Sequence, residues 1–106
     1  MKHLTEYQKD LLEALKDPLE AAEYLSAAME EGDKEAFLLA LRNVAEANGG
    51  MKAIADKAKL NRVSLYRTLS RRGNPEIRTV LALLSCMGLR LTVEPRLAGD
   101  MIESKS

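Results

Sequence analysis

The sequence predicts an all-α fold of five or six helices that ends in one short strand, and three observations support this. Apolar residues recur at helical spacing through most of the chain. Capping residues, glycines and prolines divide that pattern into separate helices. One segment near the C-terminal end changes to alternation, which is typical of a half-buried strand. The length of 106 residues suits one domain.

Three helices are predicted in the first half, over residues 4–16, 18–31 and 34–48. Asp17 can cap the second helix, and Pro18 suits its first position because a proline there removes no helical hydrogen bond. The residues expected on the buried face of the second helix are Leu19, Ala22, Leu25 and Met29. Those expected on the buried face of the third helix are Phe37, Leu38, Leu41, Val44 and Ala45.

Three more helices are predicted in the second half, over residues 51–58, 62–72 and 76–87. Asn61 is a good N-cap for the middle one, and Gly88 stands at the C-terminal end of the last one. The residues expected on the buried face of that last helix are Ile77, Val80, Leu81, Leu84 and Met87.

The alternating segment covers residues 89–95, where Leu89, Leu91 and Val93 are separated by polar residues. A lone strand needs a partner edge because its unpaired backbone groups are costly. We therefore expect it to make a dimer by antiparallel pairing with the same strand of a second copy, across a two-fold axis. The alternative is an extended tail that lies on its own helices. Residues 96–106 are expected to be a flexible tail.

The segment MKAIADKAKLNRVSLYRTLSRRG has the features of a helix-turn-helix. Such a motif needs a small residue where its helices meet, a tight bend, and a polar outer face on its second helix. Ala55 is the small residue, and arginines crowd the second helix. The residues expected to read base edges in DNA are Asn61, Arg62, Val63, Tyr66 and Arg67, and those expected on phosphates are Lys52, Arg71, Arg72 and Arg78. The alternative is a solvated surface hairpin of helices.

The formal charge is zero overall, but it is distributed unevenly along the chain. Residues 1–50 carry five Lys or Arg and eleven Asp or Glu, a net of −6, whereas residues 51–96 carry ten and three, a net of +7. The last ten residues supply the remaining −1. An acidic half joined to a basic half favours two surfaces for two partners. The alternative is that the halves only neutralise each other.

We accordingly expect three parts. Residues 1–32 form acidic N-terminal helices. Residues 33–95 form a DNA-binding domain that includes the dimerisation strand, and residues 96–106 are the tail.

The longer segment MKAIADKAKLNRVSLYRTLSRRGNPEIRTVLALLSCMGL resembles the helix-turn-helix of the lambda repressor/Cro class, with its last helix similar to the core helix that follows in that class. The inward positions of that class are occupied here by Ile54, Ala55, Ala58, Leu60 and Leu65. Two positions depart from the class. Lys59 stands where the class has its turn glycine, so an ordinary or mildly strained turn conformation is expected there. Leu69 takes the inward place expected at Thr68, which implies a longer recognition helix.

Residues 15–95 are also similar to the addiction-module antidote proteins, which are antitoxins of the HigA type. The specific parts are YLSAAMEEGD, LYRTLSRRGNP and the closing GLRLTVEP. The resemblance implies a protein that binds and neutralises a RelE/ParE-like toxin, usually an mRNA-cleaving ribonuclease. It also implies a homodimer that binds double-stranded operator DNA and represses its own operon.

Under that resemblance the acidic half has a partner, because RelE/ParE-like toxins are basic. Acidic side chains would speed association with such a toxin, and exposed apolar side chains would anchor it. The residues expected at this surface are Tyr7, Leu11, Glu13, Asp17, Glu20 and Glu23, with further charge from Glu30 and Glu31. The alternative is that the first two helices only complete the core.

No catalytic, metal-binding or cofactor-binding constellation is recognisable, so we expect neither an enzyme nor a cofactor. His3 is the only histidine and Cys86 the only cysteine, which leaves no zinc-finger spacing and no internal disulfide. No apolar run has the roughly 18 residues of a membrane span, and a reducing cytoplasm fits. Two other functions stay open: a repressor without a toxin partner, stand-alone or phage-derived, and a protein-binding helical adaptor.

Overall fold

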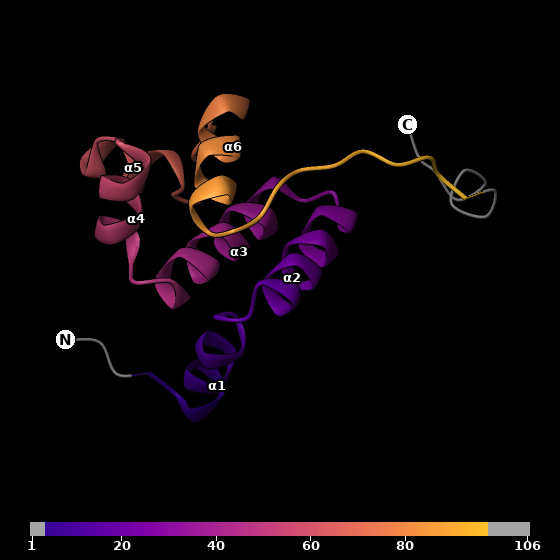
Figure 1. Cartoon of the computed structure of the whole chain (residues 1–106), viewed down its shortest axis with the longest axis horizontal. Helices are drawn as coiled ribbons and strands as arrows, with labels where there is room; N and C mark the ends of the chain where they lie inside the picture. Colours follow the sequence, from indigo (N-terminus) through magenta and orange to yellow (C-terminus); the bar gives the residue numbers. More distant parts are fainter. Residues whose placement is uncertain (1–3, 98–106) are drawn as a thin grey trace.

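A computed structural model describes residues 4–97, in which the chain forms six α-helices (Figure 1). The helices are α1 (Glu6–Ala14), α2 (Pro18–Glu30), α3 (Lys34–Ala47), α4 (Met51–Ala58), α5 (Arg62–Thr68) and α6 (Ile77–Cys86). The prediction of an all-α fold is confirmed. The expected tail beyond residue 97 and the single histidine, His3, lie outside the described residues.

Local capping interactions fix the N-terminal ends of the first three helices. Thr5 and Gln8 form a reciprocal capping box at α1, in which each side chain accepts a hydrogen bond from the other's backbone N–H at 2.9–3.1 Å. Asp17 and Asp33 cap α2 and α3 through their carboxylate oxygens. These contacts satisfy N–H groups that have no intrahelical partner.

The core is built around α3, against which α1, α2 and α4 pack (Figure 1). Leu38, Leu41 and Val44 of α3 are no more than 1 % exposed. The buried residues before and after residue 32 belong to one apolar cluster, so the acidic helices share their core with the basic half. This continuity places the acidic and the basic surfaces on one packed body.

The expected buried faces of α2 and α6 are partly wrong. Ala21, Leu25 and Ala28 are the buried residues of α2, whereas Leu19 is 76 % exposed. Alanines face α3 because small side chains let the two helix backbones approach closely. Met29 of α2, also predicted to be buried, is exposed. On α6, Leu83 is buried in addition to Val80 and Leu84. Ile77 and Leu81 of the same helix, which were predicted to be buried, are exposed.

The strand predicted over residues 89–95 is not present in the single chain. Leu89 N donates to the Leu84 carbonyl at 2.8 Å, and beyond it the described residues show no further backbone hydrogen bond. The segment is extended but unpaired, because residues 4–97 offer no second strand edge. The alternative prediction, an extended segment lying on its own helices, fits the part that borders α2.

Candidate nucleic-acid interface

Helices α4 and α5 pack against each other and are joined by a tight bend. Ile54, Ala55, Leu65 and Leu69 are at most 2 % exposed and hold the pair on the core. Lys59 ends α4 in the left-handed conformation, with φ 60° and ψ 43°, and Leu60 N then donates to the Ala55 carbonyl at 2.8 Å. Of the two conformations expected at Lys59, ordinary or mildly strained, the structure therefore has the strained one.

The N-terminal end of α5 is fixed by Asn61. Its Oδ1 accepts a hydrogen bond from Ser64 N at 2.9 Å, as expected for an N-cap. The same residue is predicted to read a base. The cap uses one lone pair of the amide oxygen, so the side-chain Nδ2, which is a donor, remains for a base.

The outer face of α5 carries the other side chains predicted to read base edges. Val63 is 62 % exposed and Tyr66 50 % exposed, and Arg62 and Arg67 are exposed beside them. Leu65, on the same helix, is buried. The helix therefore presents two arginines, one tyrosine and one valine to solvent while its opposite side is anchored. Lys52, the predicted phosphate contact on α4, is exposed as well.

The C-terminal end of α5 differs from the prediction. The helix ends at Thr68, and residues 70–72 form a turn and not the third turn of a longer recognition helix. Leu69 is fully buried as the C-cap residue, and this burial draws the chain away from the helix axis. The longer helix implied by the shift from Thr68 to Leu69 is therefore wrong.

Two of the three arginines predicted to contact phosphates already have carboxylate partners. Arg71 Nε lies 3.3 Å from Glu35 Oε1 on α3, and Arg78 Nε lies 3.6 Å from Glu76 Oε1. Both pairs are well exposed, so each contributes little to stability and a phosphate can compete for the arginine. Arg72 is exposed too, and among the described residues no ion pair involves it.

Sequence reasoning missed Arg42, a half-buried residue of α3. Its Nη1 donates a hydrogen bond to the carbonyl oxygen of Leu69, at the end of α5. The two residues are 27 positions apart. The helical spacing of α3 gives no indication of this contact, because spacing describes only the face of one helix.

The chain matches a family model described as "probable addiction module antidote protein" over residues 5–95. This match covers most of the chain. The chain belongs to that antidote family.

An antidote counteracts a toxin, so membership in the antidote family implies a toxin partner in general terms. A curated relative from Haemophilus influenzae strain Rd, named only as an uncharacterized protein, is 34 % identical over 93 residues. The alignment covers 86 % of this chain and 95 % of the relative. No solved structure matches the chain. The family match includes both the acidic helices and the helix pair α4–α5.

The acidic residues expected at the toxin surface are all exposed, and the structure shows what surrounds each of them. Tyr7, Glu20 and Glu23 are exposed, but Leu11 is half-buried against the core. Two of the predicted acidic residues have partners in the same chain, since Glu13 lies 3.0 Å from Lys16 Nζ and Asp17 caps α2. The structure adds Leu19, which was expected in the core and is exposed next to Glu20.

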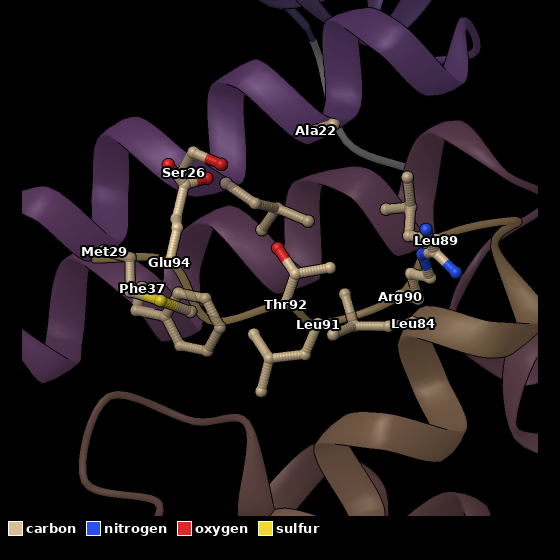
Figure 2. Close-up of a pocket in the computed structure, with 11 residues that line it drawn as sticks. Ala22, Ser26, Met29, Phe37, Leu84, Leu89, Arg90, Leu91, Thr92 and Glu94 are labelled. Carbon is tan, nitrogen blue, oxygen red and sulfur yellow. The ribbon is translucent and has the colours of Figure 1, made fainter. Parts of the chain in front are cut away.

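The predicted dimerisation residues lie on the segment after α6. Leu89 is half-buried, Leu91 is exposed and Val93 is 96 % exposed. The segment borders a groove of about 160 Å³ whose other wall includes residues of α2. In Figure 2, Phe37 and Met29 lie toward one end of the groove and Leu89 and Arg90 toward the other.

Within residues 4–97 no cluster of His, Cys, Asp and Glu has the composition of a metal site. Cys86 is partly buried on α6 and forms no disulfide. Among the helices in the described part of the chain, none is both long enough and apolar enough to cross a membrane.

Proposed function

We propose that this chain is the antitoxin of a type II toxin–antitoxin module. It neutralises a RelE/ParE-like toxin through its acidic helices, and as a homodimer it binds operator DNA and represses its own operon. The observation that carries the DNA-binding part is the outer face of α5, where Arg62, Val63, Tyr66 and Arg67 are exposed together on an anchored helix.

The side chains on α5 match the chemistry of base edges in the major groove. An arginine can donate two hydrogen bonds to O6 and N7 of guanine, and an apolar side chain can contact the methyl group of thymine. The first residues of a recognition helix lie closest to the bases. Arg62 and Val63 begin α5, so they and Tyr66 and Arg67, one turn later, form the reading set.

Replacement of Arg67 by alanine tests the reading role. If Arg67 contacts a base, Arg67→Ala weakens binding to the operator by about 1–3 kcal/mol and relaxes specificity at one base pair. The matched control is Arg72→Ala, on the turn after α5. That variant should weaken binding to all sequences equally and reduce the log–log salt slope by about 0.9, as loss of one phosphate contact requires. A uniform loss for Arg67→Ala as well would place Arg67 on a phosphate.

The toxin-binding part is supported by the exposed residues of α1 and α2. Glu20 and Glu23 project negative charge from α2, and Tyr7 and Leu19 are apolar side chains with large exposed fractions. Complementary charge raises the association rate with a basic partner. Tyrosine is among the residues that contribute most at protein interfaces. Tyr7 and Leu19 would therefore anchor the toxin, and Glu20 and Glu23 would attract it electrostatically.

Co-expression with the toxin tests this part. A neighbouring gene for a small basic protein should arrest growth, and the intact chain should restore it. The double variant Glu20→Lys/Glu23→Lys should fail to restore growth while binding operator DNA normally. Glu46→Lys, a charge reversal on the exposed side of α3, is the control and should still restore growth. Full rescue by the double variant would show that these carboxylates do not contact the toxin.

The homodimer is supported by the exposed segment after α6. Leu91 and Val93 are apolar and exposed, and the backbone groups around them have no partner within residues 4–97. Antiparallel pairing with a second copy would satisfy both the backbone and the side chains. A two-fold dimer would also present two α5 helices to the two half-sites of a palindromic operator.

A further inference from the structure

The recognition helix α5 is too short to hold its own geometry. It has seven residues, which is two turns, and helices of that length depend on tertiary contacts for their stability. Its first turn is held by the Asn61 cap, and its middle by the buried Leu65. The last carbonyl groups of a helix have no intrahelical partner and carry partial negative charge. Whatever satisfies them fixes the other end of α5.

Ser70 satisfies the Arg67 carbonyl from within the same segment, through its N–H and its hydroxyl, and Arg42 supplies the contact that comes from another helix. Its guanidinium donates to the carbonyl oxygen of Leu69, the C-cap residue of α5. A positive charge at this end of a helix is favourable, and a hydrogen bond from a charged donor is stronger than one between neutral groups. No ion pair in the described residues involves Arg42, and its hydrogen-bond partner is this backbone carbonyl.

The residues on either side of Arg42 are held by packing and by a hydrogen bond. Arg42 follows Leu41, which is fully buried, and precedes Asn43, whose Nδ2 donates to the Tyr24 hydroxyl on α2 at 2.8 Å. The guanidinium therefore extends from the best-packed helix of the molecule to the end of α5. Leu69, whose carbonyl it contacts, is fully buried as well.

We propose that Arg42 is a positioning residue for DNA readout, which sets the direction of α5 without touching DNA. This inference rests on the proposed function. Bidentate contacts tolerate errors of only about 0.5 Å, so the exposed side chains of α5 need a helix that is held at both ends. Asn61 holds the N-terminal end of α5 as its N-cap, and Arg42 of α3 contacts the C-terminal end.

The proposal distinguishes Arg42 from an arginine that binds phosphate. Loss of a phosphate contact weakens binding to every sequence and lowers the salt dependence. Loss of helix positioning weakens only the contacts that read bases, because non-specific binding depends on charge and not on the exact direction of α5. The ratio of specific to non-specific affinity therefore separates the two roles.

The experiment compares Arg42→Met with a control, Arg72→Met, which also removes one arginine but an exposed one. Each variant is titrated with duplex DNA from upstream of its own gene and with scrambled duplex, over a salt series. Arg42→Met should weaken specific binding about tenfold or more, the loss of one good base contact. It should leave the affinity for scrambled duplex and the slope of the salt dependence unchanged. Arg72→Met should weaken binding to both duplexes alike and reduce the log–log salt slope by about 0.9.

Other outcomes overturn the proposal. An equal loss on both duplexes with a reduced slope would make Arg42 a phosphate contact, and unchanged specific binding would leave it with no role in readout. Arg42→Lys keeps a charged donor for the Leu69 carbonyl, so its specificity should lie between the Met variant and the wild type. Equal loss in the Lys and Met variants would exclude the carbonyl contact as the cause.

Amide hydrogen exchange on the DNA-free protein separates positioning from general stability. Arg42→Met should speed exchange at the amides of Leu65 and Leu69 while those at the centre of α3 stay protected. Uniformly faster exchange would reduce Arg42 to a stabilising residue. If the wild type shows no preference for its own upstream DNA, the proposed function fails and the readout role with it. The exchange result would still decide whether Arg42 holds α5.

Discussion

Gly73 and Thr68 approach so closely that a Cβ atom on Gly73 would lie 1.7 Å from the Thr68 carbonyl oxygen. Gly73 N also donates to the Ser70 carbonyl at 2.8 Å, which closes the turn after α5. The φ angle of Gly73 is not in the left-handed region, so glycine is required here by space and not by backbone conformation. The chain can therefore leave α5 abruptly only because this position has no side chain.

Gly73→Ala should destabilise the fold by about 1–3 kcal/mol, because the obstructing atoms are backbone and must move. Urea denaturation measures this as a lower midpoint at an unchanged m-value. Asn74→Ala, at the exposed neighbouring position, is the control and should change stability by less than about 0.5 kcal/mol. Wild-type stability for Gly73→Ala would mean that the turn rearranges freely.

Lys59→Gly should stabilise the protein by about 0.5–1 kcal/mol. The left-handed conformation of Lys59 costs a non-glycine residue roughly 1–2 kcal/mol, and the greater entropy of glycine in the unfolded chain offsets part of the gain. Thermal and urea denaturation both report the change. Lys57→Gly, inside α4, should instead lower the free energy of unfolding by about 1 kcal/mol. If both glycine variants lose stability, the strain assigned to Lys59 is absent.

Tyr24 and Asn43 should behave as a coupled pair, since the Asn43 amide donates to the Tyr24 hydroxyl across the contact between α2 and α3. Tyr24→Phe and Asn43→Ala, alone and together, form a double-mutant cycle in urea denaturation. We expect a coupling free energy of about 0.5–1.5 kcal/mol for this part-buried hydrogen bond. Strictly additive effects would show that the bond does not join the helices in solution.

If the protein forms the proposed dimer, Val93→Asp should convert it to a monomer, because the change places a charge on the most exposed apolar residue of the segment after α6. Sedimentation equilibrium at matched concentrations measures the mass of each protein. Ser85→Asp adds the same charge to an exposed position on α6 and should leave the dimer intact. A monomeric wild type, or a dimeric Val93→Asp variant, would contradict dimerisation through this segment.

Local features of the fold were predictable from the sequence. Asp17 and Asn61 cap the helices expected of them, because a cap depends only on residues two or three positions away. The exposed face of α5 also follows from spacing, since Leu65 and Leu69 lie four positions apart on the inward side. One helix's own pattern was enough in these cases.

Features that depend on a second element were not predictable. Helix α2 has two apolar stripes, and only its packing against α3 selects Ala21 over Leu19 for burial. The end of α5 at Thr68 depends on the burial of Leu69, and the contact from Arg42 crosses 27 positions. The strand expected over residues 89–95 needs a partner edge that residues 4–97 do not contain.

The most direct test of the account is a titration of the full chain with duplex DNA from upstream of its own gene, against scrambled duplex, between about 50 and 200 mM salt. The account predicts a preference of about 1,000-fold or more for the upstream duplex, with a log–log slope near −0.9 per phosphate contact. Equal affinity for both duplexes at every salt concentration would contradict operator recognition by α5.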